Sequence, residues 1–343
     1  MKKYKSLVIL TLLSALLTGC RGSKKYEAAE YCSPLSWKSD EDFRILQLSD
    51  IHLSQSDIHE KHFALIDRTV KEAKPNLIVL NGDIFTFADK HVVKKVFSFF
   101  NDYGIPWTFT FGNHDDQGYY SDTYIQRLLS SRKFQHCIFK NLEDDNVTGR
   151  SNFVINLKDS SNTVLYQVYL LDSHSYNFDT TEYDYVKQDQ IEWYERMVNY
   201  SKDTLGGGTV VPSSLYMHIG TPECTKAWDE VKDTENVLIG DMEEFSGSPS
   251  QDLGFFQKMK ELGSTKSIHV AHDHANDSVV RYQGMYICYG VHSTDRIYND
   301  AKGIKLGGQV TSINKTTKKL TFSNIYTNYD NDEIKVVEKG ELE

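Results

Sequence analysis

The chain has 343 residues, of which 39% are hydrophobic and 25% are charged. These values are typical of a globular protein and exclude a largely disordered or membrane-embedded chain. The formal net charge of −10 argues against a protein that covers nucleic acid with a basic surface, so we expect no nucleic-acid partner. The charge places no restriction on a small phosphorylated substrate.

The first twenty residues have the pattern of an export signal. Three lysines lie among the first five residues, and the apolar run from Leu7 to Leu17 that follows is too short to span a bilayer comfortably. The run ends in Leu17-Thr18-Gly19-Cys20, which resembles the lipobox of bacterial lipoproteins. That resemblance implies that Cys20 is lipidated, becomes the new amino terminus and anchors the chain to a membrane surface. The alternative is an ordinary cleaved signal in which the cysteine is incidental.

The remaining chain predicts one domain rather than two. We expect a signal peptide at 1–20, a polar linker at 21–40, a catalytic domain at 41–329 and a fraying acidic C-terminal tail at 330–343. The signal predicts an exported protein, held on the cell surface or the extracytoplasmic face of a membrane. The sequence does not indicate an oligomeric state.

Apolar, β-rich runs alternate with segments of helical periodicity along the predicted domain. This alternation predicts an α/β layered fold in which ligands bind at the carboxyl ends of strands. The expected strands are 43–48, 77–80, 107–111, 163–171, 215–217 and 268–271, followed by a hairpin of 309–313 and 319–325. The expected helices are 62–73, 89–103, 122–132, 187–200 and 251–262.

Five clusters of metal-binding residue types follow predicted strands. Carboxylate, imidazole and amide oxygen are donors that hold two divalent or trivalent ions side by side, and such ion pairs hydrolyse phosphate esters. The sequence therefore predicts a two-metal phosphoesterase. The clusters are Asp50-Ile51-His52, Gly82-Asp83, Gly112-Asn113-His114-Asp115, His218 and His272-Asp273-His274.

The spacing within the clusters suits metal binding. Asp50 and His52 are two residues apart at a strand end, so both side chains project to one side if the strand keeps its pleat. Gly82 lets the backbone turn sharply before Asp83, whose carboxylate can then bridge two ions. Asn113 offers a neutral amide oxygen.

Each cluster alone is a weak signal, because a single histidine is more often structural than a metal ligand. All five in order, each after a β run, make a purely structural explanation improbable. His218 has the weakest motif, although it is the only histidine in its segment. The other histidines are expected to be structural, with some of them lining the pocket: His59, His62, His91, His136, His174, His269 and His292.

Over most of residues 43–300, the clusters resemble the full signature of the calcineurin-like metallophosphoesterase superfamily. The branch of short purple-acid-phosphatase-like plant proteins and related fungal phosphatases is the most similar. The resemblance implies a central β-sandwich flanked by helices (αββα), and a catalytic acid, His114, oriented by Asp115. The matching stretches are Phe43–His52, Gly112–Asp116, Gln190–Trp193 and His272–Asp277. The implied ligands are Asp50, His52, Asp83 and His274 for the first metal, and Asp83, Asn113, His218 and His272 for the second.

Two departures from the family pattern concern the metals. Ala271 stands where glycine is usual before the last His-x-His, a small change that should be tolerated. Thr86 stands where the ferric, purple members have a tyrosine three positions after the bridging aspartate. Without that phenolate we expect no purple colour and no preference for Fe(III), so the two transition-metal ions are Mn, Zn or Fe, with their identity open.

We therefore expect hydrolysis of a phosphomonoester, on a phosphorylated small molecule or phosphoprotein, with a metal-bridging hydroxide as nucleophile. One alternative is a phosphodiesterase that uses the same metals. An alternative of another class is a non-catalytic lipoprotein that binds metal or phosphate. The intact pair His114 and Asp115 argues against the binding protein, because binding alone does not require a leaving-group acid.

Overall fold

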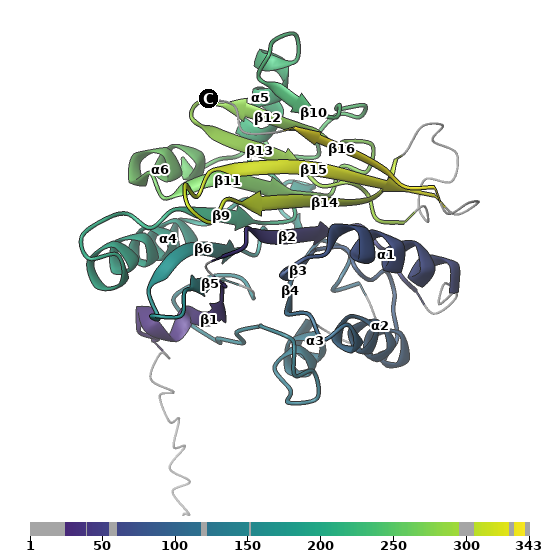
Figure 1. The fold of residues 1–343 in the computed structure, drawn as a ribbon, viewed down its shortest axis with the longest axis horizontal. Helices are drawn as coiled ribbons and strands as arrows, with labels where there is room; N and C mark the ends of the chain where they lie inside the picture. The colour runs from purple at the N-terminus through teal and green to yellow at the C-terminus, as the bar shows by residue number, and fades with distance from the viewer. Residues whose placement is uncertain are drawn as a thin grey trace, which may run out of the picture.

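The computed structural model describes residues 25–38, 40–54, 60–117, 122–150, 152–294, 305–328 and 333–339. The predicted signal peptide and Cys20 lie outside these residues. Two β-sheets pack face to face, and helices cover their outer faces (Figure 1). This arrangement confirms the predicted α/β fold with a central β-sandwich. Among the described residues, no helix is long and apolar enough to cross a membrane.

The six-stranded sheet contains the first predicted strands and the C-terminal hairpin. Strands β2, β3 and β4 form a parallel half that ends at the edge strand β4, and β14 pairs with β2 in the antiparallel direction. The strand order is β16 (Lys335–Lys339), β15 (Leu320–Thr327), β14 (Leu306–Ile313), β2 (Phe43–Leu48), β3 (Leu77–Asn81) and β4 (Trp107–Thr110).

The eight-stranded sheet has a parallel centre, formed by β6, β9, β11 and β13. The parallel strands of both sheets direct their carboxyl ends toward loops that carry the predicted ligands. The strand order is β1 (Cys32–Ser36), β5 (Phe153–Lys158), β6 (Val164–Leu170), β9 (Ser213–Tyr216), β11 (Thr265–Val270), β13 (Met285–Tyr289), β12 (Val279–Tyr282) and β10 (Val237–Ile239).

Strand β2 is buried on both of its faces. Phe43 and Ile45 pack between the two sheets, whereas Leu46 and Leu48 pack under the helices. Alternate residues of a strand point to opposite faces, so a strand inside a layered fold needs apolar residues on both. The apolar composition of residues 43–48 therefore predicts a buried strand.

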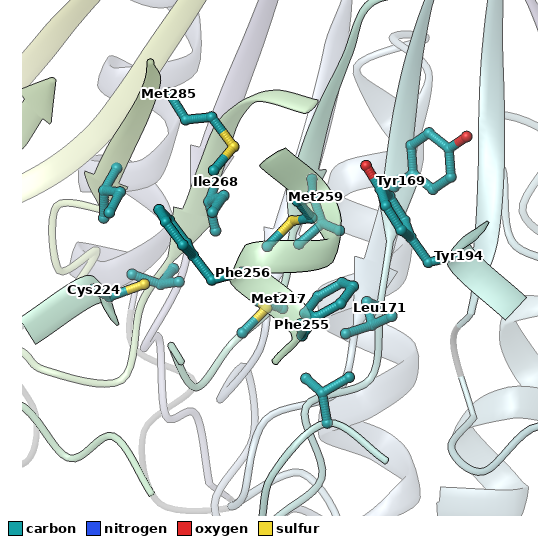
Figure 2. Close-up of a cluster of buried hydrophobic side chains, with 14 of the residues drawn as sticks. Tyr169, Leu171, Tyr194, Met217, Cys224, Phe255, Phe256, Met259, Ile268 and Met285 are labelled. Atoms are coloured by element: carbon teal, nitrogen blue, oxygen red, sulfur yellow. The ribbon is translucent and has the colours of Figure 1, made fainter. Parts of the chain in front are cut away.

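Helices α1 (Glu60–Ala73), α2 (Lys90–Asp102) and α3 (Asp122–Leu129) contribute to one apolar cluster with the six-stranded sheet. Helices α4 (Gln188–Tyr200), α5 (Pro222–Val231) and α6 (Phe255–Leu262) contribute to another with the eight-stranded sheet. Figure 2 shows part of this second cluster. The short elements are η1 (Ala28–Tyr31), η2 (Ser201–Leu205) and a hairpin of β7 (Tyr176–Asn177) and β8 (Glu182–Tyr183).

The helix boundaries follow from local chemistry. The carboxylate of Asp89 accepts hydrogen bonds from the backbone N–H groups of His91 and Val92, at 2.8 and 2.9 Å, and so begins α2. Pro222 occupies the first turn of α5, where its missing N–H costs nothing. Gly263 ends α6 in the left-handed region, with φ of 68°.

Two expected boundaries of the domain are wrong. The residues expected to form a polar linker include β1, which pairs with β5, and Tyr31 and Trp37 are buried. The expected fraying tail includes β16, which pairs with β15 in the antiparallel direction. In both cases pairing with another strand orders a segment whose own composition is polar.

Candidate metal centre

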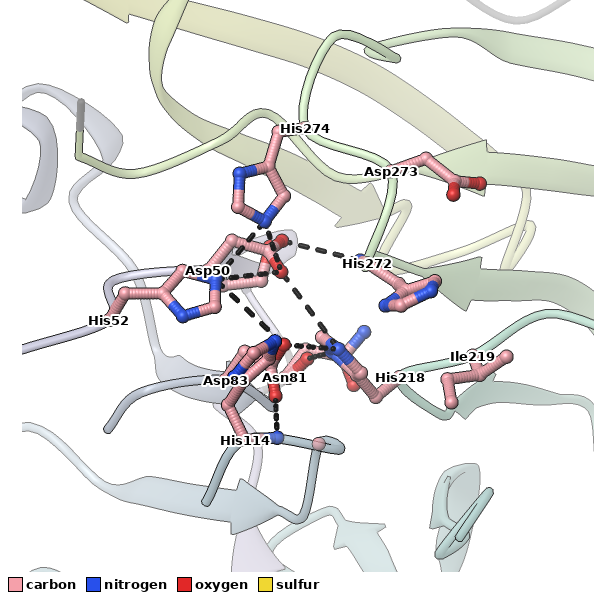
Figure 3. Close-up of polar contacts among 12 residues, drawn as sticks. Asp50, His52, Asn81, Asp83, His114, His218, Ile219, His272, Asp273 and His274 are labelled. Atoms are coloured by element: carbon pink, nitrogen blue, oxygen red, sulfur yellow. Dashed lines mark hydrogen bonds and ion pairs between the residues drawn. The ribbon is translucent and has the colours of Figure 1, made fainter. Parts of the chain in front are cut away.

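The predicted ligands meet where carboxyl ends from both sheets face one another (Figure 3). The six-stranded sheet supplies Asp50 and His52 after β2, Asp83 after β3, and Asn113 and His114 after β4. The eight-stranded sheet supplies His218 after β9, and His272 and His274 after β11. The site is therefore divided between the two sheets.

The backbone at four predicted ligands has an unusual conformation. Asp50, His52, Asp83 and His272 have positive φ values of 54°, 50°, 51° and 74°, which non-glycine residues rarely adopt. Backbone strain of this kind persists where surrounding structure fixes it, and it is common at functional sites. Here backbone hydrogen bonds join Asp50 N to Gly82 O at 3.1 Å and His52 N to Asp83 O at 2.9 Å.

Gly82 is required for the approach of the two sheets. Its φ is 84°, and a Cβ atom at this position would lie 2.4 Å from Nδ1 of His218. Any larger residue would therefore displace a predicted ligand that belongs to the opposite sheet. The sharp turn expected at this glycine is present, and its second role is to make room for His218.

The ligand set predicted for the first metal converges around Asp50. Its Oδ1 lies 3.5 Å from Nε2 of His274, and the Nε2 atoms of His52 and His274 are 3.1 Å apart. Donor atoms of Asp50, His52 and His274 all lie within 4.8 Å of one another. These atoms surround a common point, as the ligands of one ion do.

The second set converges around Asp83. Its Oδ2 lies 3.1 Å from Nε2 of His218 and 3.8 Å from Nε2 of His52. Donor atoms of Asp83, His218 and His272 form a second group within 4.8 Å. Because Asp83 faces both groups, its carboxylate is placed to bridge two ions.

Several buried donor atoms have no hydrogen-bond partner among the described residues. They are both side-chain polar atoms of Asn113 and, apart from the contacts with His274 and Asp83 given above, Oδ1 of Asp50 and Nε2 of His218. A buried polar atom left unpaired costs about 1–3 kcal/mol, so several together indicate a ligand. The donor set of carboxylates, imidazoles and an amide fits transition-metal ions.

The charges of the site are distributed unevenly. Burial alone would raise the pKa of Asp50, but a hydrogen bond and charge from His274 hold that pKa well below its usual range. Burial likewise opposes ionisation of Asp83, and the charge of His218 lowers the pKa of this carboxyl. Both aspartates are therefore carboxylates at neutral pH and attract a cation.

The imidazoles differ from one another. Burial lowers the pKa of His52 and of His272 to about 3, so both are neutral donors at pH 7. Burial would lower the pKa of His218 as well, but Asp83 and then Asp50 outweigh it and raise the pKa to about 10. A proton and a metal ion therefore compete for Nε2 of His218.

The predicted catalytic histidine lies beside the shared carboxylate. The backbone N–H of His114 donates to Oδ1 of Asp83 at 2.7 Å, and the His114 ring contacts His52 with centroids 5.0 Å apart. Nδ1 of His114 forms a 2.8 Å hydrogen bond with Oε1 of Gln117. Its other nitrogen, Nε2, is not part of this bond.

Asp115 was expected to orient His114, but its described hydrogen bonds run to the backbone instead. Its carboxylate accepts the N–H groups of Asp83 and Gly112 at 2.9 and 2.8 Å, and those of Ile84 and Phe85 at 3.0 Å each. Asp115 therefore fixes the loop after β3, and the residue that contacts the imidazole is Gln117. The loop amides outcompete the ring because they surround the buried carboxylate.

Some supporting residues were missed by sequence reasoning. The hydroxyl of Thr86 lies 2.8 Å from Nδ1 of His52, so the residue that replaces tyrosine supports a ligand. The ring of His292, expected to be structural, stacks on His274 with centroids 4.2 Å apart. The ring of Tyr183 contacts His272 edge-on, with centroids 4.3 Å apart. Only the ligand spacing was visible in the sequence, whereas these contacts join distant segments.

This fold is that of a phosphoesterase, and the clustered side chains are consistent with binding of two metal ions. The chain belongs to the calcineurin-like phosphoesterase family, whose profile matches residues 43–306. That match confirms the family resemblance and the prediction that the protein is a hydrolase of phosphate esters.

Relatives support the same branch. "Probable inactive purple acid phosphatase 14" of Arabidopsis thaliana is 28% identical over 296 residues, covering 74% of this chain and 71% of the relative. "Phosphatase DCR2" of Saccharomyces cerevisiae is 26% identical over 278 residues, covering 72% of this chain and 47% of the relative. The crystal structure of a dimetal phosphatase from Danio rerio has a TM-score of 0.54 at 9% identity, covering 82% of this chain and 95% of that one, and so shares the fold.

Proposed function

We propose that the protein is a phosphatase that hydrolyses phosphate monoesters with two transition-metal ions, Mn, Zn or Fe. The observation that carries the proposal is the shared position of Asp83 between two groups of buried ligands. Asp50, His52, Asp83 and His274 would hold the first ion. Asp83, Asn113, His218 and His272 would hold the second. Thr86 offers no phenolate, so the loaded protein should not be purple.

Two bound ions would supply Lewis acidity and a water whose pKa falls from about 15.7 to roughly 7. Among the seven ligands only Asp50 and Asp83 are anionic, and the other five are neutral donors. The ligands therefore do not cancel the charge of two divalent ions. The remaining positive charge favours a phosphate dianion and the charge that develops in the transition state.

His114 supports turnover rather than binding alone. Gln117 fixes one nitrogen of the ring at 2.8 Å, which leaves Nε2 to donate a proton to the leaving oxygen. His114 is followed by Asp115, whose four backbone hydrogen bonds hold the loop that contains Asp83. A protein that only retained phosphate would not need an acid at this position.

The decisive experiment compares substrates on purified protein that starts after Cys20. Turnover of p-nitrophenyl phosphate and of bis(p-nitrophenyl) phosphate should be measured with elemental analysis of the same samples. A monoesterase gives the higher kcat/KM on the monoester, with about two ions per chain. Preference for the diester would make the protein a phosphodiesterase. Two bound ions without turnover of either ester would indicate a binding protein.

We also propose that Cys20 carries lipid and anchors the enzyme to a membrane surface. The proposal rests on the leader, the apolar run and the Leu17-Thr18-Gly19-Cys20 sequence. Full-length protein should then fractionate with membranes, and Cys20→Ser should lose that association while keeping its activity. A mature protein that starts elsewhere and is wholly soluble would contradict the anchor.

A further inference from the structure

The metal centre needs the two sheets to be held at a fixed separation and register. Asp83 comes from the six-stranded sheet and His218 from the eight-stranded sheet, yet their donor atoms are 3.1 Å apart. Asp50 and His274 face one another across the same boundary at 3.5 Å. Apolar packing between sheets is not directional, so it does not by itself fix such distances. Directional contacts near the ligands would.

Asn81 makes such contacts from the end of β3. Its side chain is fully buried, and Nδ2 donates to the carbonyl of Met217 at 3.1 Å and to that of His269 at 3.3 Å. Oδ1 accepts the hydroxyl of Thr110 at 3.0 Å, which orients the amide. The side chain therefore links the six-stranded sheet to both β9 and β11.

The backbone of Asn81 contacts the site as well. Nδ1 of His218 forms a 2.9 Å hydrogen bond with the carbonyl of Asn81. Because a carbonyl only accepts, Nδ1 carries the proton and Nε2 is the nitrogen free to bind an ion. Asn81 thus fixes the strand before His218 with its side chain and the tautomer of His218 with its backbone.

Gln47 makes the equivalent link from β2. It is buried, and its Nε2 donates to the carbonyl of Val270 at 2.9 Å. Gly290 provides the space, because a Cβ atom there would lie 2.2 Å from Nε2 of Gln47. Gln47 and Asn81 are called the cross-sheet amides below.

For both cross-sheet amides, the donor residue and the acceptor residue each precede a predicted metal ligand by one to three residues in the chain. Asn81 precedes Asp83 by two residues, and its acceptor Met217 directly precedes His218. Gln47 precedes Asp50 by three residues, and its acceptor Val270 precedes His272 by two. Each bond therefore joins strand ends where a displacement would separate donors of the metal centre.

We propose that the cross-sheet amides are positioning residues that set the distance between the two halves of the metal centre. Asn81 positions His218 against Asp83 for the second ion, and Gln47 positions the strand end of β11 against Asp50. The inference depends on the two-metal centre and not on the choice of monoester as substrate. An ordinary structural role would instead affect stability alone.

Asn81→Leu tests this distinction. It removes the amide donor from the carbonyls of Met217 and His269, which by itself lowers stability, so the test needs a control that loses a buried hydrogen bond away from the metal ligands. The matched control is Tyr194→Phe. It removes a buried hydrogen bond of 2.7 Å between Tyr194 Oη and Thr265 Oγ1, at the opposite end of the same strand β11. Metal-depleted proteins are titrated with Mn²⁺ by calorimetry, with melting temperatures and the spin coupling of the Mn pair recorded in parallel.

Asn81→Leu should weaken the binding of the second ion roughly 10- to 100-fold, as loss of supporting contacts around metal ligands commonly does, and reduce the Mn–Mn coupling. Gln47→Leu should weaken mainly the first ion. Tyr194→Phe should leave both affinities and the coupling at the wild-type level. Thr110→Val, a conservative change that only releases the amide of Asn81, should give a smaller effect of the same kind and serves if Asn81→Leu does not fold.

Unchanged metal affinity and coupling in Asn81→Leu, or in Thr110→Val if the first variant does not fold, would overturn the proposal. So would an equal loss of metal in Tyr194→Phe, because the effect would then be one of general stability. Wild-type protein that binds fewer than two ions would instead refute the two-metal centre on which the proposed function rests. The two failures are thus distinguishable.

Discussion

The two sheets contribute differently to the proposed metal centre. The six-stranded sheet carries both anionic candidate ligands, Asp50 and Asp83, and backbone hydrogen bonds join their loops directly. The eight-stranded sheet provides imidazoles only, from His218, His272 and His274. Charge is therefore concentrated on one sheet, and neutral donors complete the coordination from the other.

Because of this division, one sheet attracts metal cations by charge and the other favours particular metals by ligand type. Carboxylates attract any cation, whereas imidazoles favour transition-metal ions over magnesium and calcium. Loss of a carboxylate on the six-stranded side should therefore reduce the affinity for all metals. A change on the eight-stranded side should affect one ion and its identity.

Asp83→Asn should have the largest effect, because it removes the one charge that both ions share. If loss of this buried partner costs about 3–5 kcal/mol for each ion, as breaking a buried pair does, each affinity falls roughly 2 × 10²- to 5 × 10³-fold. Loading of both ions together would then fall by the product of the two factors. Elemental analysis after dialysis measures the loss. Asp67→Asn, which changes an exposed pair with Lys71, is the control and should keep both ions.

His218→Gln should lose only the second ion. If Asp83→Asn and His218→Gln instead lose metal to the same extent, the two sheets do not contribute in the different ways described.

His114→Ala should keep both metals and lose activity roughly 10²- to 10⁴-fold on alkyl phosphates, the usual range for general acid catalysis. An alkoxide leaves poorly without a proton, whereas p-nitrophenolate departs readily, so the loss on p-nitrophenyl phosphate should be distinctly smaller. Steady-state kinetics on both substrates measures this difference. His91→Ala, at an exposed position on α2, is the matched control. Equal losses on both substrates would point to phosphate binding, and loss of metal would make His114 a ligand.

Much of the fold could be predicted because the central strands carry their own signal. Residues 43–48 are apolar enough to be buried on both faces, and the structure has the same bounds for β2. In contrast, β1 reads Cys-Ser-Pro-Leu-Ser and is only partly buried. Its strand conformation depends on β5, more than one hundred residues away. A local pattern does not contain that information.

The candidate site could also be predicted only as far as local sequence patterns allow. Ligand types and their positions after strands were visible, because each is a local property of the sequence. The contact between Thr86 and His52 and the cross-sheet contact of Asn81 depend on how separate segments pack. Gln117 lies only three residues from His114, but a glutamine in a loop has no pattern that distinguishes it from a solvated one.

Gln117→Leu tests the revised support of His114 and should have an intermediate effect. Loss of the Oε1 acceptor should lower activity roughly 10- to 100-fold, the range associated with a misplaced catalytic group, and mainly on alkyl phosphates. Metal content should stay at the wild-type level. Asp115→Asn should act differently, because it disturbs the loop that contains Asp83 and should weaken metal binding as well. Kinetics combined with elemental analysis separates the two variants, and identical behaviour would restore Asp115 as the orienting residue.

The smallest expected effect is the release of protons when metal binds, which should differ between His218 on the eight-stranded sheet and His52 on the six-stranded sheet. In the metal-free protein the pKa of His218 is about 10, so this side chain is charged at pH 6. His52, with a pKa of about 3, is already neutral. A metal ion binds neutral imidazole, so loading should release about one proton per chain from His218 and none from His52. At pH 6 a metal-bound water, with a pKa of roughly 7, adds little to this number.

The affinity for the second ion should therefore rise about tenfold per pH unit near pH 6, where His218 releases one proton per ion. The rise should be steeper above roughly pH 7, where the metal-bound water also loses a proton. The contribution of His218 should end above its pKa of about 10, where His218 is neutral before the metal arrives. Calorimetry in two buffers of different ionisation enthalpy counts the protons directly. His218→Gln should release about one proton fewer than wild type. A pH-independent affinity near pH 6 would show that His218 is neutral without metal, and that the carboxylates of the six-stranded sheet do not hold a proton on the opposite sheet.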